Sequence, residues 1–199
     1  MELCKLITEE EIEVVIKELP CNKAPSPDGI PAEFYKNCWS LVKKDLVDAV
    51  SHFFRTSQLP PQWKSTFIDL VPKVKGPSSA KDYRPITLCN VCYKIVSKIL
   101  VNDKSVLHLL VSQEQSAFIS ERMIMDNVLP AQEILHSMGN RGDGKKLMAL
   151  KLNMEREYDR MHWDFLRKVM RRFGFDCMFI GLIMGCIQNP LFAVLVMEL

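Results

Sequence analysis

The sequence lacks any long apolar segment. No stretch of its 199 residues approaches the ~20 consecutive apolar residues needed to span a bilayer. The first residues, MELCKLITEEEIE, are acidic, whereas a secretory signal peptide begins with a basic segment and continues with an apolar one. We therefore expect an intracellular protein with no signal peptide and no transmembrane segment. The sequence does not decide between nucleus and cytoplasm.

The sequence also lacks a regular pattern of cysteines or histidines. Seven cysteines are an odd number, and their irregular spacing argues against a disulfide framework. Cys89 and Cys92 form a C-x-x-C, but no second C-x-x-C and no histidine pair lies at metal-ligand spacing. We therefore favour packed thiols over a zinc or redox site. The four histidines share no motif, and none has a serine or cysteine nucleophile recognisably placed for it.

An excess of one charge is missing as well. The chain has 26 basic and 24 acidic residues, a net charge of +2, which indicates no particular partner. A hydrophobic fraction of 48% with 25% charged residues is typical of a globular protein and argues against disorder. The length fits one domain or part of one.

Local patterns in the first half predict helices followed by a strand. Thr8 and Glu11 form a capping box before an apolar stripe that ends at Pro20. A rigid proline-rich loop follows, and Pro31 begins a second helical region that extends to residue 55. Alternating side chains predict a strand over residues 65–73, and Asn90 is expected to cap the next helix.

The second half is organised around residues 148–166, where a strand pattern meets a helix pattern. Met148, Leu150 and Leu152 alternate with polar or small residues, which predicts a strand ending at Asn153. Apolar residues then recur at helical spacing until Gly174. A further helix over 179–187 and a strand over 191–196 are expected. The helix before Gly174 carries Arg167, Lys168, Arg171 and Arg172, which form either a solvated face or a nucleic-acid contact.

The stretch KLNMEREYDRMHWDFL resembles the first carboxylate motif of the reverse transcriptases of plant LINE-type (non-LTR) retrotransposons, which reads close to K-L-D-M-x-K-A-Y-D-R. The resemblance places Asn153 where the family has a metal-binding catalytic aspartate. It places Tyr158 where an aromatic side chain lies under the sugar of the incoming nucleotide. The amide of Asn153 offers Mg²⁺ only a neutral oxygen in place of a charged carboxylate.

Three further blocks resemble the same family. NKAPSPDG is similar to N-K-A-P-G-P-D-G, with Ser26 in place of a glycine, so a left-handed backbone at this position would be strained. Lys73 and Arg84 match basic residues of the fingers that lean over the nucleotide triphosphate. QSAFISERMIMDN resembles a block in which the basic residue, here Arg122, helps to hold the template.

The resemblance implies an α+β fold, a partial right-hand polymerase with helix-rich fingers and an incomplete palm sheet. Residues 1–199 would form one partial reverse transcriptase domain, with fingers and early palm over about 1–145 and palm over about 146–199. No Asp-Asp pair occurs in the sequence, so the expected segment ends before that family motif. Two-metal nucleotidyl transfer requires several converging carboxylates.

These features predict a truncated remnant of an RNA-directed DNA polymerase that is catalytically inactive, with Asn153 as a degenerate metal-ligand position. No cofactor is expected in this chain, whereas the family uses Mg²⁺. The alternative is a module that binds RNA or an RNA/DNA duplex without catalysis. The partners implied by the resemblance are an RNA template and a DNA primer, and no membrane. A metal-free scaffolding role has no sequence feature behind it.

Overall fold

The structure is a computed structural model that describes residues 7–102, 111–112, 114–115, 119, 122–140, 148–150, 152 and 160–195. The chain divides into two compact units. The first comprises Met1–Asn102 and Trp163–Leu199, and the second comprises Asp103–His162. Helices and a small three-stranded sheet give the mixed architecture predicted from the sequence. Among the described residues, no helix is long and apolar enough to cross a membrane.

Four helices from the first half of the chain supply much of the core of the first unit. They are α1 (Glu9–Glu18), α2 (Ala32–Asn37), α3 (Trp39–Thr56) and α4 (Val91–Asn102). The predicted capping box at the start of α1 is confirmed, because Glu11 N–H donates to Thr8 Oγ1 over 3.2 Å and Thr8 N–H donates to Glu11 Oε2 over 3.0 Å. The largest fully buried side chains of these helices lie at helical spacing and are Ile12, Ile16, Val50, Phe53, Ile95 and Val96.

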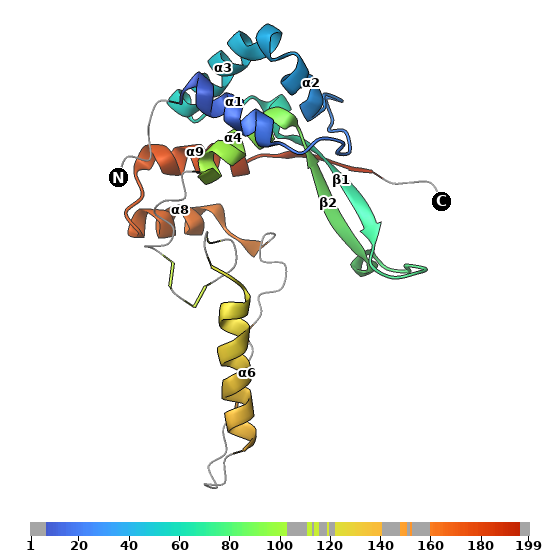
Figure 1. Ribbon diagram of the computed structural model, residues 1–199, viewed down its shortest axis with the longest axis vertical. Helices are drawn as coiled ribbons and strands as arrows, with labels where there is room; N and C mark the ends of the chain where they lie inside the picture. Colours follow the sequence, from blue (N-terminus) through green and yellow to red (C-terminus); the bar gives the residue numbers. More distant parts are fainter. Residues whose placement is uncertain are drawn as a thin grey trace. The chain divides into compact units, whose positions relative to one another are not determined.

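A β-hairpin and one later strand form the sheet. After the 3₁₀ turn η1 (Pro61–Lys64), β1 (Ser65–Pro72) pairs antiparallel with β2 (Tyr83–Cys89), and η2 (Ala80–Asp82) lies between them. Strand β3 (Leu191–Leu195) pairs parallel with β1, so the order is β2-β1-β3. Figure 1 shows the hairpin extending away from α1 to α4 of the same unit. The strand at 65–73 and the strand at 191–196 are thus confirmed, whereas β2 was not predicted.

The proline-rich loop between α1 and α2 is fixed by side-chain hydrogen bonds. Ser26 is buried, and its Oγ donates to Asp28 Oδ1 over 2.7 Å. The left-handed residues of the loop are Asn22, with φ 55°, and Gly29, with φ 69°, whereas Ser26 does not have a positive φ. The strain considered for Ser26 is therefore not present.

Asn90 precedes α4 as predicted, but its side chain connects other segments. Its Oδ1 accepts from Asp28 N–H at 3.4 Å, and its Nδ2 donates to the Gln62 carbonyl at 2.7 Å. Asn90 is 3% exposed, so both bonds are shielded from water and hold the proline-rich loop and η1 at the start of α4.

Two helices near the end of the described chain complete the first unit. Helix α8 (Trp163–Arg172) ends before Gly174, whose φ of 83° suits the glycine predicted there. Helix α9 (Cys177–Ile187) begins at Asp176, which accepts from Met178 N–H over 2.7 Å. Its glycines, Gly181 and Gly185, face Ser57 at the end of α3, so the two helices approach closely.

The second unit contains α6 (Met125–Gly139). Pro130 lies inside this helix, beyond the first turn. The strand predicted to end at Asn153 is wrong at the positions that the structure describes, because none of residues 148–150 and 152 lies in a strand, and Lys151 and Asn153 lie outside the described residues. Met148, Leu150 and Leu152 are 84%, 72% and 84% exposed. Alternation stabilises a strand only where a neighbouring strand or helix covers its apolar face, and here these side chains are open.

Candidate functional site

The hairpin places two of the predicted site residues, Lys73 and Arg84, beside each other. Arg84 pairs with Val71 across the antiparallel ladder, so both side chains lie on one face of the ribbon. Lys73 N–H donates to the Asp82 carbonyl over 2.7 Å, which continues the ladder one residue beyond β1. Because alternate residues of a strand share a face, Lys73 lies on the same face as Val71 and Arg84.

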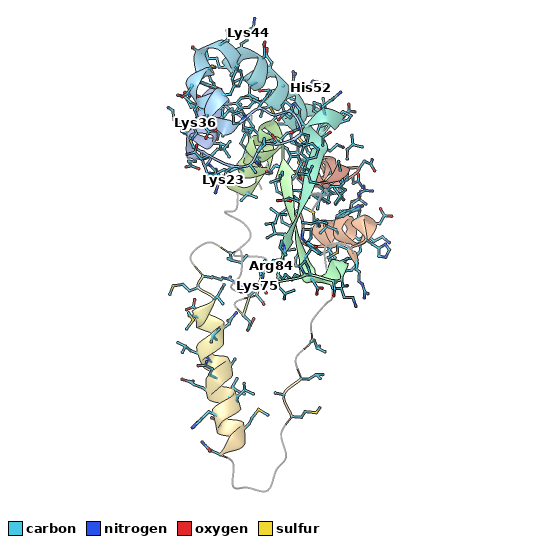
Figure 2. All side chains as sticks on the ribbon, turned by 90° about the vertical axis from the view of Figure 1, so that its right-hand side faces the viewer. Lys23, Lys36, Lys44, His52, Lys75 and Arg84 are labelled. Carbon is cyan, nitrogen blue, oxygen red and sulfur yellow. The ribbon has the colours of Figure 1, made fainter. Side chains whose placement is uncertain are left out.

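Residues 73–84 are strongly basic, and we refer to them as the hairpin end. They contain four cationic side chains and a single carboxylate, that of Asp82. Arg84 is exposed and forms no ion pair among the residues that the structure describes. Figure 2 shows Arg84 and Lys75 near the far end of the ribbon, well away from Lys44 on the helical side. The hairpin end is therefore accessible to an anionic ligand.

The ammonium group of Lys73 is oriented by the opposite side of the hairpin. Its Nζ donates to the Lys81 carbonyl oxygen at 2.7 Å. An ammonium group carries three donors, so this bond fixes the side chain and leaves two donors for a ligand. Lys73 is exposed, and water or phosphate oxygens can occupy those positions.

Asp82 closes the loop that joins Lys73 to Arg84. Its Oδ2 accepts from Ser78 N–H at 3.0 Å and from Ser79 N–H at 2.9 Å, and Ser79 and Asp82 form a capping box around η2. Asp82 was not among the site residues predicted from the sequence. The spacing Ser79-x-x-Asp82 is the signature that indicates such a cap.

Arg122, the predicted template-binding residue, belongs to the second unit. Its guanidinium donates to three carbonyl oxygens of the preceding segment, those of Ser112 at 2.5 Å, Gln115 at 2.7 Å and Val111 at 3.3 Å. In this structure Arg122 therefore binds its own backbone. Contact with a template stays a prediction.

Asn153 and Tyr158 lie outside the described residues, so the structure gives no geometry for the degenerate metal position or the sugar-facing aromatic residue. The described residues contain no group of three or more His, Cys, Asp or Glu side chains that could hold a metal ion. At position 153 the donor is a neutral amide. This position therefore supplies less charge than the carboxylates that commonly bind a pair of Mg²⁺ ions, and the absence of a metal cofactor stays a prediction.

A separate cavity of about 360 Å³ lies at the base of the hairpin. It is lined by the proline-rich loop, by Thr87 and Leu88 of β2, and by the start of α4. Lys23 and Lys94 contribute its cationic groups and Glu33 its carboxylate. Neither Lys73 nor Arg84 lines it, so the cavity is distinct from the hairpin end.

The C-x-x-C cysteines are used in packing. Cys92 is buried, and its Sγ lies 3.1 Å from the Tyr35 hydroxyl. Burial raises the pKa of the Cys92 thiol and also raises the pKa of Tyr35. Cys89 Sγ accepts from Thr66 Oγ1 at 3.2 Å. These contacts explain both sulfur atoms without a metal.

Helix α8 carries the second basic group identified in the sequence. Lys168, Arg171 and Arg172 are exposed, and Arg167 lies 3.6 Å from Asp164 one turn away. An exposed pair of this kind contributes little to stability. Exposed cationic side chains fit both a solvated helix face and a nucleic-acid contact, so both alternatives stay predictions.

The family is established by comparison with known proteins. The sequence pattern of the family described as Reverse transcriptase (RNA-dependent DNA polymerase) matches residues 71–197. The chain is 31% identical over 176 residues, or 88% of its length, to the "Transposon TX1 uncharacterized 149 kDa protein" of Xenopus laevis. It spans 13% of the length of that protein. The matched region includes the hairpin end and position 153, and the chain belongs to the reverse transcriptase (RNA-dependent DNA polymerase) family.

Proposed function

We propose that this chain is part of a retrotransposon reverse transcriptase that has lost nucleotidyl transfer and keeps a phosphate-binding hairpin in its fingers. The observation that carries the proposal is the amide at position 153, where the family motif has an aspartate. A carboxylate supplies a full negative charge to a divalent ion, and Asn153 does not.

The motifs also indicate the class of retrotransposon to which the chain belongs. The motifs around Asn153 and in NKAPSPDG resemble those of LINE-type (non-LTR) retrotransposons of plants. The transposon protein of Xenopus laevis supports a transposon-related origin. We therefore assign the chain to the LINE-type group, with a plant-like motif pattern.

Primer extension tests the inactive assignment. The 199-residue chain is incubated with an RNA template, an annealed DNA primer and deoxynucleotides, in either Mg²⁺ or Mn²⁺. We expect no template-dependent extension, while an active reverse transcriptase extends the same primer in parallel. Extension by the wild-type chain that disappears in Asn153→Ala or Tyr158→Ala would show that position 153 still supports catalysis and that the proposal is wrong.

A second candidate function, binding of RNA or an RNA/DNA duplex without catalysis, is favoured by the hairpin end. Four cationic side chains project there against a single carboxylate, and Arg84 is exposed. Guanidinium and ammonium groups bind phosphate oxygens without reading sequence, and such binding weakens steeply with salt. Fluorescence anisotropy of a labelled RNA/DNA duplex over a salt series measures this. A salt-independent affinity, or one unchanged by Arg84→Ala, would contradict it.

A further inference from the structure

Asp82 is the one acidic side chain of the hairpin end. A carboxylate near a phosphate site opposes an anion through charge alone. Register places Asp82 opposite Lys73, since Lys73 N–H continues the ladder onto the Asp82 carbonyl. The backbones of Lys73 and Asp82 are therefore joined where the two strands end, two residues from Arg84. A residue that only repelled the ligand would weaken the site, so its contacts need a physical explanation.

The contacts of Asp82 hold the loop between the two cations. Its carboxylate accepts from the backbone N–H groups of Ser78 and Ser79, and its own N–H donates to the Ser79 carbonyl at 2.9 Å. The same residue accepts from Lys73 N–H, and the adjacent Lys81 carbonyl accepts from Lys73 Nζ. Hydrogen bonds to a charged acceptor are shorter and stronger than neutral ones.

We propose that Asp82 is the positioning residue of the hairpin end: its carboxylate fixes residues 76–81, and thereby sets Lys73 and Arg84 for binding phosphate groups. This inference rests on the proposed phosphate-binding role of the hairpin and adds the residue that organises it. Packing does not fix this loop at Gly76, which has a φ of 68° and no heavy atom within 4 Å of the point where a Cβ would stand. The hydrogen bonds of the Asp82 carboxylate are therefore needed to hold the loop in one conformation. Without the carboxylate, residues 76–81 sample other conformations, and a smaller fraction of molecules holds Lys73 and Arg84 in the conformation that binds phosphate.

Removing the Asp82 carboxylate should weaken phosphate binding if Asp82 positions the loop, and should strengthen it if the carboxylate only repels the anion. Asp69 offers a matched control because it lies on β1 on the same face as Val71 and Lys73, and its carboxylate forms no hydrogen bond or ion pair within the described part of the chain. Asp69→Ala and Asp82→Ala each remove one negative charge. Charge alone predicts that both variants bind an anion more tightly, by about twofold at low salt.

The experiment titrates the 199-residue chain with inorganic tripolyphosphate and, separately, with a labelled RNA/DNA duplex. We expect Asp69→Ala to bind slightly more tightly than wild type and Asp82→Ala to bind roughly three- to tenfold more weakly, since fewer molecules hold the competent loop. Asp82→Asn, which keeps an acceptor oxygen, should fall between wild type and Asp82→Ala. The two titrations show whether the site favours the phosphates of a nucleotide or those of a nucleic-acid backbone.

Hydrogen exchange gives a readout that does not depend on the ligand. The amides of Ser78 and Ser79 should exchange faster in Asp82→Ala and stay unchanged in Asp69→Ala. If Lys73→Ala and Arg84→Ala weaken phosphate binding while Asp82→Ala binds as tightly as wild type or more tightly, the positioning role is overturned and the proposed function stands. If Lys73→Ala and Arg84→Ala bind tripolyphosphate and the duplex like wild type, the positioning role of Asp82 and the proposed phosphate-binding role of the hairpin are both overturned. Lys44→Ala, on α3, controls for loss of charge elsewhere.

Discussion

Substituting Gly185 by alanine tests the close approach of α9 to α3. A Cβ atom at position 185 would collide with the Ser57 carbonyl oxygen and lie 3.3 Å from Phe53 Cε2. The oxygen belongs to the backbone, at a residue whose φ is 57° and whose N–H donates to the Phe53 carbonyl over 2.7 Å. Relief of the clash therefore requires α9 or the end of α3 to move.

The magnitude follows from two opposing effects. Forcing a methyl group into a well-packed contact costs up to about 3 kcal/mol, while replacing glycine by alanine inside a helix contributes about 1 kcal/mol of stability. We expect Gly185→Ala to lower the free energy of unfolding by about 2 kcal/mol. The midpoint of thermal unfolding should fall by roughly 4–8 °C for a chain of this size.

Tryptophan fluorescence during urea unfolding measures the change in the free energy of unfolding of the first unit, which contains α3 and α9. All three tryptophans, Trp39, Trp63 and Trp163, lie in the first unit. The neighbouring Gly181 provides a matched control, because a Cβ there would meet the movable Ser57 Oγ at 2.9 Å. Ser57→Ala should relieve Gly181→Ala and leave Gly185→Ala unrelieved. A Gly185→Ala chain as stable as wild type, or more stable, would refute the packing argument.

The remaining predictions concern charge, metal binding and thiol reactivity. Arg84→Ala should weaken duplex binding on the order of fivefold at low salt and reduce the salt slope by about 1, whereas Arg55→Ala, an exposed arginine near the end of α3, should leave both unchanged; anisotropy measures this, and equal effects of the two variants would contradict a specific site. Asn153→Asp should tighten Mn²⁺ binding by about 30-fold if other oxygen ligands lie nearby, since one charge at ~4 Å from a divalent ion contributes roughly 2 kcal/mol even in water; electron paramagnetic resonance detects it, and an unchanged affinity would indicate that no metal position remains. Exposed Cys21 and Cys177 should react rapidly with maleimide at pH 8, while Cys186, whose pKa burial raises to about 12, should stay protonated and unreactive up to about pH 10 in the folded chain; mass spectrometry of the labelled sites distinguishes these outcomes. Burial also raises the pKa of Tyr93 to about 12, so the unfolded chain loses its Tyr93 proton first and stability should fall as pH rises above 10; a denaturant midpoint that is constant from pH 9 to 11 would contradict this.

Local signals predicted much of the first unit. The Thr8 and Glu11 capping box, the end of α8 at Gly174 and the strand before Lys73 depend on neighbours within a few residues of the chain. Such interactions form wherever the tertiary structure permits them. The corresponding elements were therefore predicted correctly from the residues alone.

Elements that depend on distant partners were less predictable. Strand β2 contains Pro85, and a proline normally argues against a strand because it lacks an N–H for the sheet. However, β2 lies at an edge of the sheet, where the missing N–H can face solvent. The pattern at Met148, Leu150 and Leu152 is that of a strand, but the structure gives it no covering partner. Asn90 was predicted as a cap, and its two bonds to Asp28 and Gln62 depend on loops distant in sequence.

The candidate site divides in the same way. Lys73 and Arg84 were selected through resemblance, and their register across β1 and β2 explains why both belong to one face. Asp82 was missed because a carboxylate in a basic segment is expected only to weaken anion binding. Its structural role follows from its hydrogen bonds to the Ser78 and Ser79 N–H groups, which are known only from the structure. No described contact bears on Asn153 or Tyr158, so their roles stay predictions.

Phosphate binding and metal catalysis depend on different kinds of group, and under the proposed function this difference allows one chain to lose metal catalysis and keep phosphate binding. A phosphate site needs cations held in place, and Lys73 and Arg84 satisfy that need through backbone contacts of the hairpin. A two-metal site depends on charged carboxylates, and an amide in place of one carboxylate weakens the attraction for the metal ions. We therefore propose that Asn153 deprives the metal position of a ligand charge, whereas the hydrogen bonds of Lys73 and Asp82 in the hairpin end do not involve position 153. A chain that binds tripolyphosphate through Arg84 and fails to extend a primer is the outcome that this separation predicts.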